Sequence, residues 1–156
     1  MKIVVASDSH RNYQALADIV TAENDADLFL HAGDFQTDLT YLSGFLAVRG
    51  NNDLWIDVPQ QRILTCEGIK IWLVHSDQYS SYNRLEALYK KAREEGYQIV
   101  CFGHTHTPYL EKRSAVWLVN PGSLWYNRDG SPVGYVVINI AAGKILAVKR
   151  QLYGKN

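Results

Sequence analysis

Residues 3–10 read Ile-Val-Val-Ala-Ser-Asp-Ser-His, a short apolar run followed at once by a carboxylate and an imidazole. The apolar run predicts a buried strand over Ile3–Ser7. Asn12 is a favoured N-cap residue, and the apolar residues after it have helical spacing: Ala15, Leu16, Ile19 and Val20. A strand, a polar turn and a helix in this order indicate an α/β protein.

The same alternation of apolar runs and polar breaks continues to the end of the chain. Further strands are expected at Leu28–His31, Phe45–Val48, Arg62–Cys66, Ile69–Val74, Gln98–Phe102, Tyr109–Arg113, Val116–Val119, Gly134–Ile140 and Lys144–Leu152. Glu67-Gly68 and residues 141–143 are expected to be hairpin turns. The early strands alternate with helical segments and the late strands form hairpins. This order favours mixed sheets, and two packed sheets with helices outside would account for the late strands.

Two more helical segments are expected. Leu39–Ser43 is short enough for a single turn of helix. Asn83–Glu95 has a clear apolar face, Asn83 and Glu86 have the spacing of a capping box, and Gly96 ends the segment.

The bulk composition excludes several classes of protein. The 156 residues favour one domain over residues 1–156. Sixteen basic and sixteen acidic residues give no charge-based reason to expect binding to long nucleic acid or to a membrane. Two cysteines, Cys66 and Cys101, cannot form the disulfide framework of a secreted mini-protein. The N-terminal apolar run is too short for a signal peptide, so a cytoplasmic location is expected.

Polar groups suited to metal binding follow five of the expected strands. They are Asp8 and His10, then Gly33-Asp34, then Asn51 and Asp53, then His75, then His104 and His106. Ligands bind beyond the carboxyl ends of strands in α/β sheets, so these groups are expected to converge. In an extended chain, residues two apart point to the same side, which would aim each Asp-x-His or His-x-His pair at one spot.

Each motif alone is also typical of an ordinary turn or helix cap. Four of the five histidines, however, stand at strand ends beside other ligand types. Oxygen and imidazole ligands without thiolate suit Mn, Fe, Co, Ni or Zn. The joint pattern therefore favours a metal site over a set of unrelated turns.

Taken in order, Asp-x-His, Gly-Asp, Gly-Asn-x-Asp, a lone His and Gly-His-x-His resemble the calcineurin-like metallophosphoesterase superfamily. The short length and Asn120-Pro121-Gly122-Ser123 resemble its YfcE-type phosphodiesterase branch. The resemblance implies a four-layer α-β-β-α sandwich with two mixed sheets. It implies two divalent ions, with Mn²⁺ expected and Fe, Ni, Co or Zn as alternatives. It also implies the ligands: Asp8, His10, Asp34 and His106 for one ion, and Asp34, Asn51, His75 and His104 for the other.

The expected reaction is hydrolysis of a small phosphate ester, with a nucleotide-like substrate as one option. Two cations about 3.5–4 Å apart would clamp the phosphate and acidify a bridging water, whose hydroxide attacks phosphorus. Asp34, Asn51 and His75 would be catalytic through this hydroxide. A phosphodiesterase is expected first and a phosphomonoesterase second. The third reading is a non-catalytic scaffold, as in the retromer subunit of this fold, although the ligand set here is complete.

This chain departs from the family pattern at two positions. Asn52 replaces a histidine proposed to assist the leaving group, and an amide cannot supply that proton. Asp77 stands two residues after His75, at a position where relatives in this family often have a histidine. It could be a proton donor, a partner of a ligand histidine or a solvated loop residue.

The roles of the remaining candidates are more open. We expect His31 to be structural. Arg11 and Ser123 could contact substrate. Several aromatic side chains could stack on a base or only pack: Tyr79, Tyr82, Trp125 and Tyr126. Trp55 and Trp125 could also line a contact in a homo-oligomer.

Overall fold

The computed structural model describes residues 1–42 and 44–154. Its elements, in chain order, are β1 (Lys2–Ala6), α1 (Tyr13–Ala22), β2 (Leu28–His31), the 3₁₀-helix η1 (Leu39–Leu42), β3 (Phe45–Ala47), β4 (Gln61–Cys66), β5 (Ile69–Val74), α2 (Arg84–Glu95), β6 (Ile99–Phe102), β7 (Tyr109–Arg113), β8 (Val116–Asn120), β9 (Gly134–Ala141) and β10 (Lys144–Leu152). Every expected strand is present with nearly the expected bounds.

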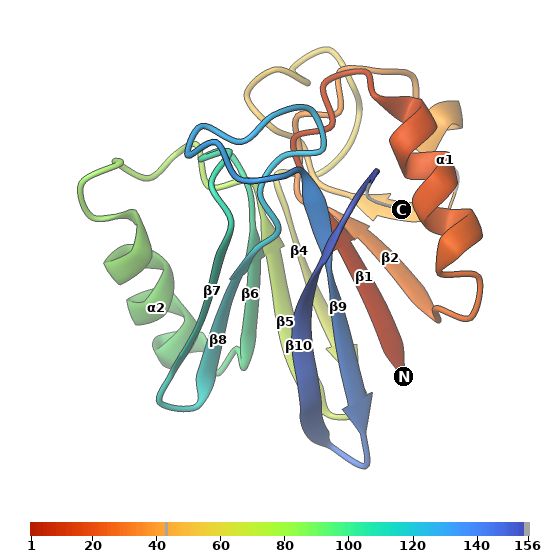
Figure 1. Ribbon diagram of the computed structural model, residues 1–156. Coiled ribbons are helices and arrows are strands. Elements are labelled where there is room, and N and C mark those ends of the chain that lie inside the picture. The colour runs from red at the N-terminus through yellow and green to blue at the C-terminus, as the bar shows by residue number, and fades with distance from the viewer. Residues whose placement is uncertain (43, 155–156) are drawn as a thin grey trace.

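The strands form two mixed sheets of five, as Figure 1 shows. The first has the order β10-β9-β1-β2-β3, with β1, β2 and β3 parallel and the β9–β10 hairpin antiparallel to them. The second has the order β4-β5-β6-β8-β7, with β5, β6 and β8 parallel and a hairpin at each edge. In the second sheet the parallel strands lie at the centre, whereas in the first they run from the central strand β1 to the edge strand β3.

Alternating side chains of each central strand build three apolar layers. Ile3 and Val5 of β1 face Ile71 and Leu73 of β5 in the layer between the sheets. Because strand residues alternate in direction, Val4 and Ala6 face outward and pack under α1. In the same way, the fully buried Trp72 of β5 packs under α2.

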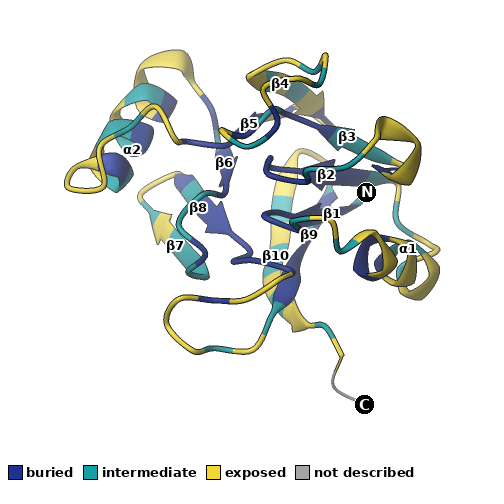
Figure 2. Ribbon diagram, turned by 90° about the horizontal axis from the view of Figure 1, so that it is seen from above, coloured by how far each residue is buried: buried dark blue, intermediate teal, exposed yellow. Residues whose placement is uncertain are grey.

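The resulting order of layers is helix, sheet, sheet, helix. Figure 2 shows it from above, with α1 and α2 on opposite sides of the buried strands. The expected four-layer α-β-β-α sandwich is therefore confirmed.

The hairpin turns follow the expected chemistry. Glu67 and Gly68 both have positive φ, 46° and 82°, as do Ala142 and Gly143, 49° and 71°. Two successive residues with positive φ form the turn that matches the twist of paired strands. Both hairpins were expected at these positions.

Of the two expected N-terminal caps, the one of α1 is confirmed and the one of α2 is wrong. Asn12 accepts a hydrogen bond from the Ala15 backbone N–H, 3.3 Å, and caps α1 as expected. The expected capping box of α2 is wrong, because the Asn83 side chain makes no capping hydrogen bond. Glu86 pairs instead with Arg113 on β7, 3.1 Å. Ser43, the last residue of the short helix expected at Leu39–Ser43, lies outside the described residues.

Among the described residues, no helix is long and apolar enough to cross a membrane.

Candidate metal centre

The polar side chains that follow β1, β2, β3, β5 and β6 meet at one end of the sandwich. The parallel strands of both sheets end there, and the loops after them gather at the top of Figure 1. All seven expected ligands lie in one continuous cluster: Asp8, His10, Asp34, Asn51, His75, His104 and His106. The expected convergence of the five strand ends is confirmed.

One group of potential ligand atoms comes from Asp8, His10 and His106. The Nε2 atoms of His10 and His106 lie 3.0 Å apart, and His106 Nε2 lies 3.3 Å from Asp8 Oδ1. The other ring nitrogen of His10 is held by Gln36 Oε1 at 2.7 Å. The Nε2 atom of His10 is therefore turned toward the other two ligands.

A second group joins Asp8, Asp34 and His75. His75 Nε2 lies 3.4 Å from Asp34 Oδ2 and 3.2 Å from Asn51 Oδ1. Asn51 Oδ1 also lies 3.0 Å from His104 Nδ1. Asn51 thus brings His75 and His104 together.

Asp34 belongs to the second group and also lies near the first. Its Oδ2 is 3.4 Å from His75 Nε2 on one side and 4.0 Å from His10 Nε2 on the other. Both carboxylate oxygens are fixed by Asn52, through its backbone N–H at 2.8 Å and its side-chain amide at 2.6 Å. Asn52, read from the sequence only as a missing histidine, therefore orients the central carboxylate.

The ionisation of the centre follows from these contacts. Burial opposes charge on Asp34, but His75 and the donors of Asn52 outweigh it and hold the pKa of Asp34 well below its usual value. Burial disfavours the charged form of His75 as well and by itself would lower its pKa. The hydrogen bond to Asp34 and the charge of Asp8 outweigh this effect and raise the pKa of His75 to about 9. The centre attracts positive charge strongly.

The lone pairs of the ligands fit a cation. His75 Nδ1 donates to the Ala32 carbonyl at 2.7 Å, so Nε2 faces two oxygen acceptors, Asn51 Oδ1 and Asp34 Oδ2, and carries either a proton or a metal ion toward them. Asp8 Oδ1 is fully buried and accepts no hydrogen bond from any described residue. Buried acceptors that face one another are costly unless a proton or a metal ion lies between them. The donor set of imidazole nitrogen and carboxylate oxygen suits a divalent transition metal.

The ligand residues have a backbone conformation that was not predicted from their spacing in the sequence. Asp8, His10, Asp34, His104 and His106 have φ values of 50°, 43°, 58°, 70° and 52°. The extended conformation assumed for the Asp-x-His and His-x-His pairs is therefore wrong. His104 and His106 also point to different groups. Left-handed backbone at non-glycine residues costs free energy and is typical of functional sites.

Two glycines let the ligand loops approach one another. A Cβ on Gly50 would overlap the carboxylate and backbone nitrogen of Asp34, and a Cβ on Gly103 would overlap Ser7 Oγ and approach Asp8 Oδ2 within 2.7 Å. Only a residue without a side chain fits at either position.

Asp53 was not assigned a role from the sequence, yet it anchors the loop that carries Asp34. Its fully buried carboxylate accepts backbone hydrogen bonds from Asp34 at 2.7 Å, Gln36 at 2.8 Å and Gly50 at 2.9 Å. The only sequence signal was its fixed place at the end of Gly-Asn-x-Asp.

Residues 120–123 also support the centre from behind. Ser123 is fully buried, and its hydroxyl donates to the Asp8 carbonyl at 2.7 Å. Asn120 donates to the Gly103 carbonyl at 3.1 Å. Ser123 therefore holds the backbone of a ligand, and the idea that it contacts substrate is not supported.

The other sequence candidates lie outside the cluster. His31 is fully buried, contacts Ser9 Oγ at 3.1 Å through Nε2 and accepts from the Gly33 N–H, a structural role as expected. Asp77 is exposed and makes no hydrogen bond or ion pair with the described residues. Tyr79 packs against Trp72, with ring centroids 6.4 Å apart, and Tyr82 is almost fully exposed.

Two aromatic rings do border the centre. The ring centroid of Trp125 lies 5.3 Å from that of His10, and Tyr126 lies 5.5 Å from His106. Both remain substantially exposed.

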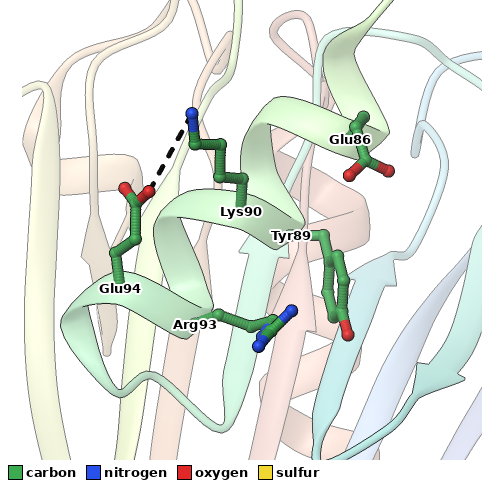
Figure 3. A pocket seen from close by; sticks show the side chains of 5 residues that line it. All are labelled: Glu86, Tyr89, Lys90, Arg93 and Glu94. Atoms are coloured by element: carbon green, nitrogen blue, oxygen red, sulfur yellow. Dashed lines mark ion pairs between the residues drawn. The ribbon is translucent and has the colours of Figure 1, made fainter.

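A separate hollow of about 360 Å³ lies on α2, away from these ligands. Figure 3 shows that all five lining side chains come from this one helix, with Lys90 and Glu94 paired at 4.0 Å. None of the five belongs to the metal cluster, so the hollow is a charged helix surface and not part of the centre.

Comparison with known sequences agrees with this geometry. The sequence model of one protein family, the calcineurin-like phosphoesterase superfamily domain, matches residues 1–143. The chain is similar to the probable metallophosphoesterase YsnB of Bacillus subtilis, 29% identical over 143 residues, covering 90% of this chain and 85% of that protein. A probable metallophosphoesterase of Methanocaldococcus jannaschii is 35% identical over 133 residues, covering 79% and 68%. Phosphodiesterase YfcE of Escherichia coli K12 is 29% identical over 115 residues, covering 68% and 58%.

Comparison with solved structures agrees on the fold. A predicted phosphoesterase from Streptococcus pneumoniae superposes with a TM-score of 0.86 at 23% identity, covering 97% of this chain and 88% of that one. Zinc-complexed Vps29 from Entamoeba histolytica has a TM-score of 0.76 at 20% identity, covering 97% of both chains.

Proposed function

Because the chain belongs to the calcineurin-like phosphoesterase superfamily, we propose that it is a metal-dependent phosphodiesterase acting on a small phosphate ester. The observation that carries the proposal is the position of Asp34. Its carboxylate lies between the His10–His106 pair and the His75–Asn51–His104 group. One carboxylate between two groups of ligands suits a pair of ions that share it.

We propose that the ligands divide into two sets that share Asp34. Asp8, His10, His106 and Asp34 would hold one ion, and Asp34, Asn51, His75 and His104 the other. Two divalent ions, when bound, supply Lewis-acid activation of water and of the phosphate oxygens. We propose Mn²⁺ as the activating ion, with Fe, Ni, Co and Zn as alternatives of the same ligand preference.

The protein's own contribution is to hold this arrangement rigid. His75 is oriented by the Ala32 carbonyl, His10 by Gln36 and Asp34 by Asn52. Partners of this kind fix the direction of a ligand atom and raise its affinity for metal. We propose that Asp34, Asn51 and His75, which lie within 3.4 Å of one another along the chain Asp34 Oδ2–His75 Nε2–Asn51 Oδ1, lie closest to the reacting water and phosphorus.

Protonation of the leaving group has no donor within this cluster. The Asn52 amide donates its hydrogen bond to Asp34, and Asp77 is exposed and makes no hydrogen bond or ion pair with the described residues. Esters with good leaving groups are therefore the better substrates. YfcE, a relative of this chain, is named a phosphodiesterase, and this supports diesters over monoesters.

The experiment compares bis-p-nitrophenyl phosphate with p-nitrophenyl phosphate on metal-stripped protein, with Mn²⁺, Zn²⁺ or no ion added back. We expect Mn²⁺-dependent hydrolysis and a higher kcat/KM for the diester. A higher kcat/KM for the monoester would replace the diesterase by a phosphomonoesterase. Folded protein that binds metal but hydrolyses neither ester would favour a protein-interaction scaffold of this fold.

A further inference from the structure

A second hollow, of about 710 Å³, opens beside the metal centre. Residues 36–39 and 55–57 form its walls, together with Arg11. We call it the Trp55 groove. Its volume is in the range of pockets that bind small organic molecules.

The groove is joined to the centre through two residues. Arg11 follows the ligand His10 directly in the chain, and Gln36 holds His10 Nδ1 at 2.7 Å. The backbone N–H of Arg11 donates to the Phe35 carbonyl at 2.9 Å, which fixes the segment carrying Arg11 against the segment carrying Gln36. A phosphate at the centre would therefore place one of its substituents in the groove.

The side chains of the groove are those that recognise a nucleoside. Trp55 is 69% exposed, so most of a large aromatic side chain is accessible for stacking on a planar group. Asp57 makes no hydrogen bond or ion pair with the described residues, and the Asp38 carboxylate accepts hydrogen bonds from the backbone and side chain of Thr40. Carboxylates accept from hydroxyl and amino groups and repel a second phosphate.

Arg11 supplies the matching positive charge. It is exposed, and its guanidinium has no ion pair within the described part of the chain. Among the lining residues it is the one next to a metal ligand, so it is placed for the phosphate end of a bound nucleotide.

We infer that the Trp55 groove binds the nucleoside portion of a nucleotide ester, with the base on Trp55 and the phosphate directed past Arg11 to the metal centre. This inference rests on the proposed phosphodiesterase function, because it names the substrate class of that site.

The kinetic test uses two diesters with the same leaving group, thymidine 5′-(p-nitrophenyl) phosphate and methyl p-nitrophenyl phosphate. The measured quantity is the ratio of their kcat/KM values with Mn²⁺-loaded protein. Trp55→Ala is expected to lower this ratio about tenfold, mainly through KM for the thymidine ester, since stacking on one base contributes that much. Leu54→Ala, at an equally exposed apolar neighbour outside the groove, is the matched control. An unchanged ratio in Trp55→Ala would overturn the inference.

A binding test separates the groove from the catalysis. Thymidine 5′-monophosphate is added to metal-free protein, and the NMR signal of the Trp55 indole N–H, identified by its loss in Trp55→Phe, is followed. We expect this signal to shift on binding, and Arg11→Gln to weaken the binding of the monophosphate more than that of thymidine. A signal that does not move would contradict the groove. A shift without any hydrolysis by the loaded enzyme would retain the groove and contradict the phosphodiesterase.

Discussion

The Nε2 atoms of His10 and His106, which come from loops almost a hundred residues apart in the chain, lie 3.0 Å apart. Gln36 holds the opposite nitrogen of the His10 ring, so the two Nε2 atoms face each other beside the buried Asp8 carboxylate. Two imidazole lone pairs at this distance need a proton or a cation between them. The number of metal ions bound per chain should therefore depend on these two histidines.

Removing one member of this pair should therefore remove one ion. We expect His106→Ala to bind about one Mn²⁺ per chain where the wild type binds two, because the group around Asp34 and His75 remains. Elemental analysis of protein after removal of free metal measures the stoichiometry. His31→Asn, at a buried histidine outside the cluster, is the control and should keep both ions. Full occupancy in His106→Ala would contradict the assignment.

Asp53 should be important for stability even without metal. Asp53→Ala leaves three backbone N–H groups without their acceptor, those of Asp34, Gln36 and Gly50. We expect the free energy of unfolding of the metal-free protein to fall by about 3 kcal/mol, since each unsatisfied buried donor costs roughly 1 kcal/mol or more. Urea unfolding measures this. The exposed Asp57→Ala should change the free energy by less than about 0.5 kcal/mol, and a similarly small effect of Asp53→Ala would refute the anchoring role.

The free energy of unfolding should depend on pH through the protonation of His31. Burial lowers the pKa of this ring to about 4 in the folded protein, against about 6.5 in the unfolded chain. The unfolded chain therefore takes up the proton first as pH falls, and stability is lost between pH 6.5 and 4. The loss amounts to about 3 kcal/mol.

The comparison variant is His31→Asn, which cannot titrate. Unfolding of both metal-free proteins by urea at pH 7, 5.5 and 4 should show a shallower decline in the variant. Equal declines would mean that His31 is not buried in the neutral form.

Asp77 tests whether a carboxylate replaces the missing histidines. Because Asp77 is exposed and makes no hydrogen bond or ion pair with the described residues, Asp77→Asn should change kcat for bis-p-nitrophenyl phosphate by less than about twofold. A large loss of kcat at full metal content would instead assign it a role in proton transfer to the leaving group.

Much of the fold and of the ligand set could be predicted from the sequence, because both depend on local patterns. The apolar runs locate every strand, and the polar residues after five of them locate the centre. Residues that act at a distance could not be predicted in this way. Asn52 appeared only as a departure from a family pattern, yet its two donors fix Asp34.

The backbone conformation of the ligand residues could not be predicted from the sequence pattern either. Residue spacing suggested extended chain at Asp8 and His10, whereas both have left-handed backbone. That conformation is set by contacts between loops, such as the hydrogen bonds from the backbone of Asp8 to the Gly33 carbonyl and from that of His10 to the Asp34 carbonyl, both 3.0 Å. Interactions between distant segments cannot be read from spacing. The capping box of α2 failed for the same reason, because Glu86 is bound by Arg113 of another strand.

The most direct test of the two-ion centre is the rate of bis-p-nitrophenyl phosphate hydrolysis as Mn²⁺ is titrated into metal-stripped wild type and Asp34→Asn. We expect the wild-type rate to rise until about two ions per chain are bound. We expect Asp34→Asn to lose at least about a hundredfold in kcat, since this carboxylate lies near ligands of both ions. Full activity in the stripped wild type, or wild-type kcat in Asp34→Asn, would contradict the two-ion centre.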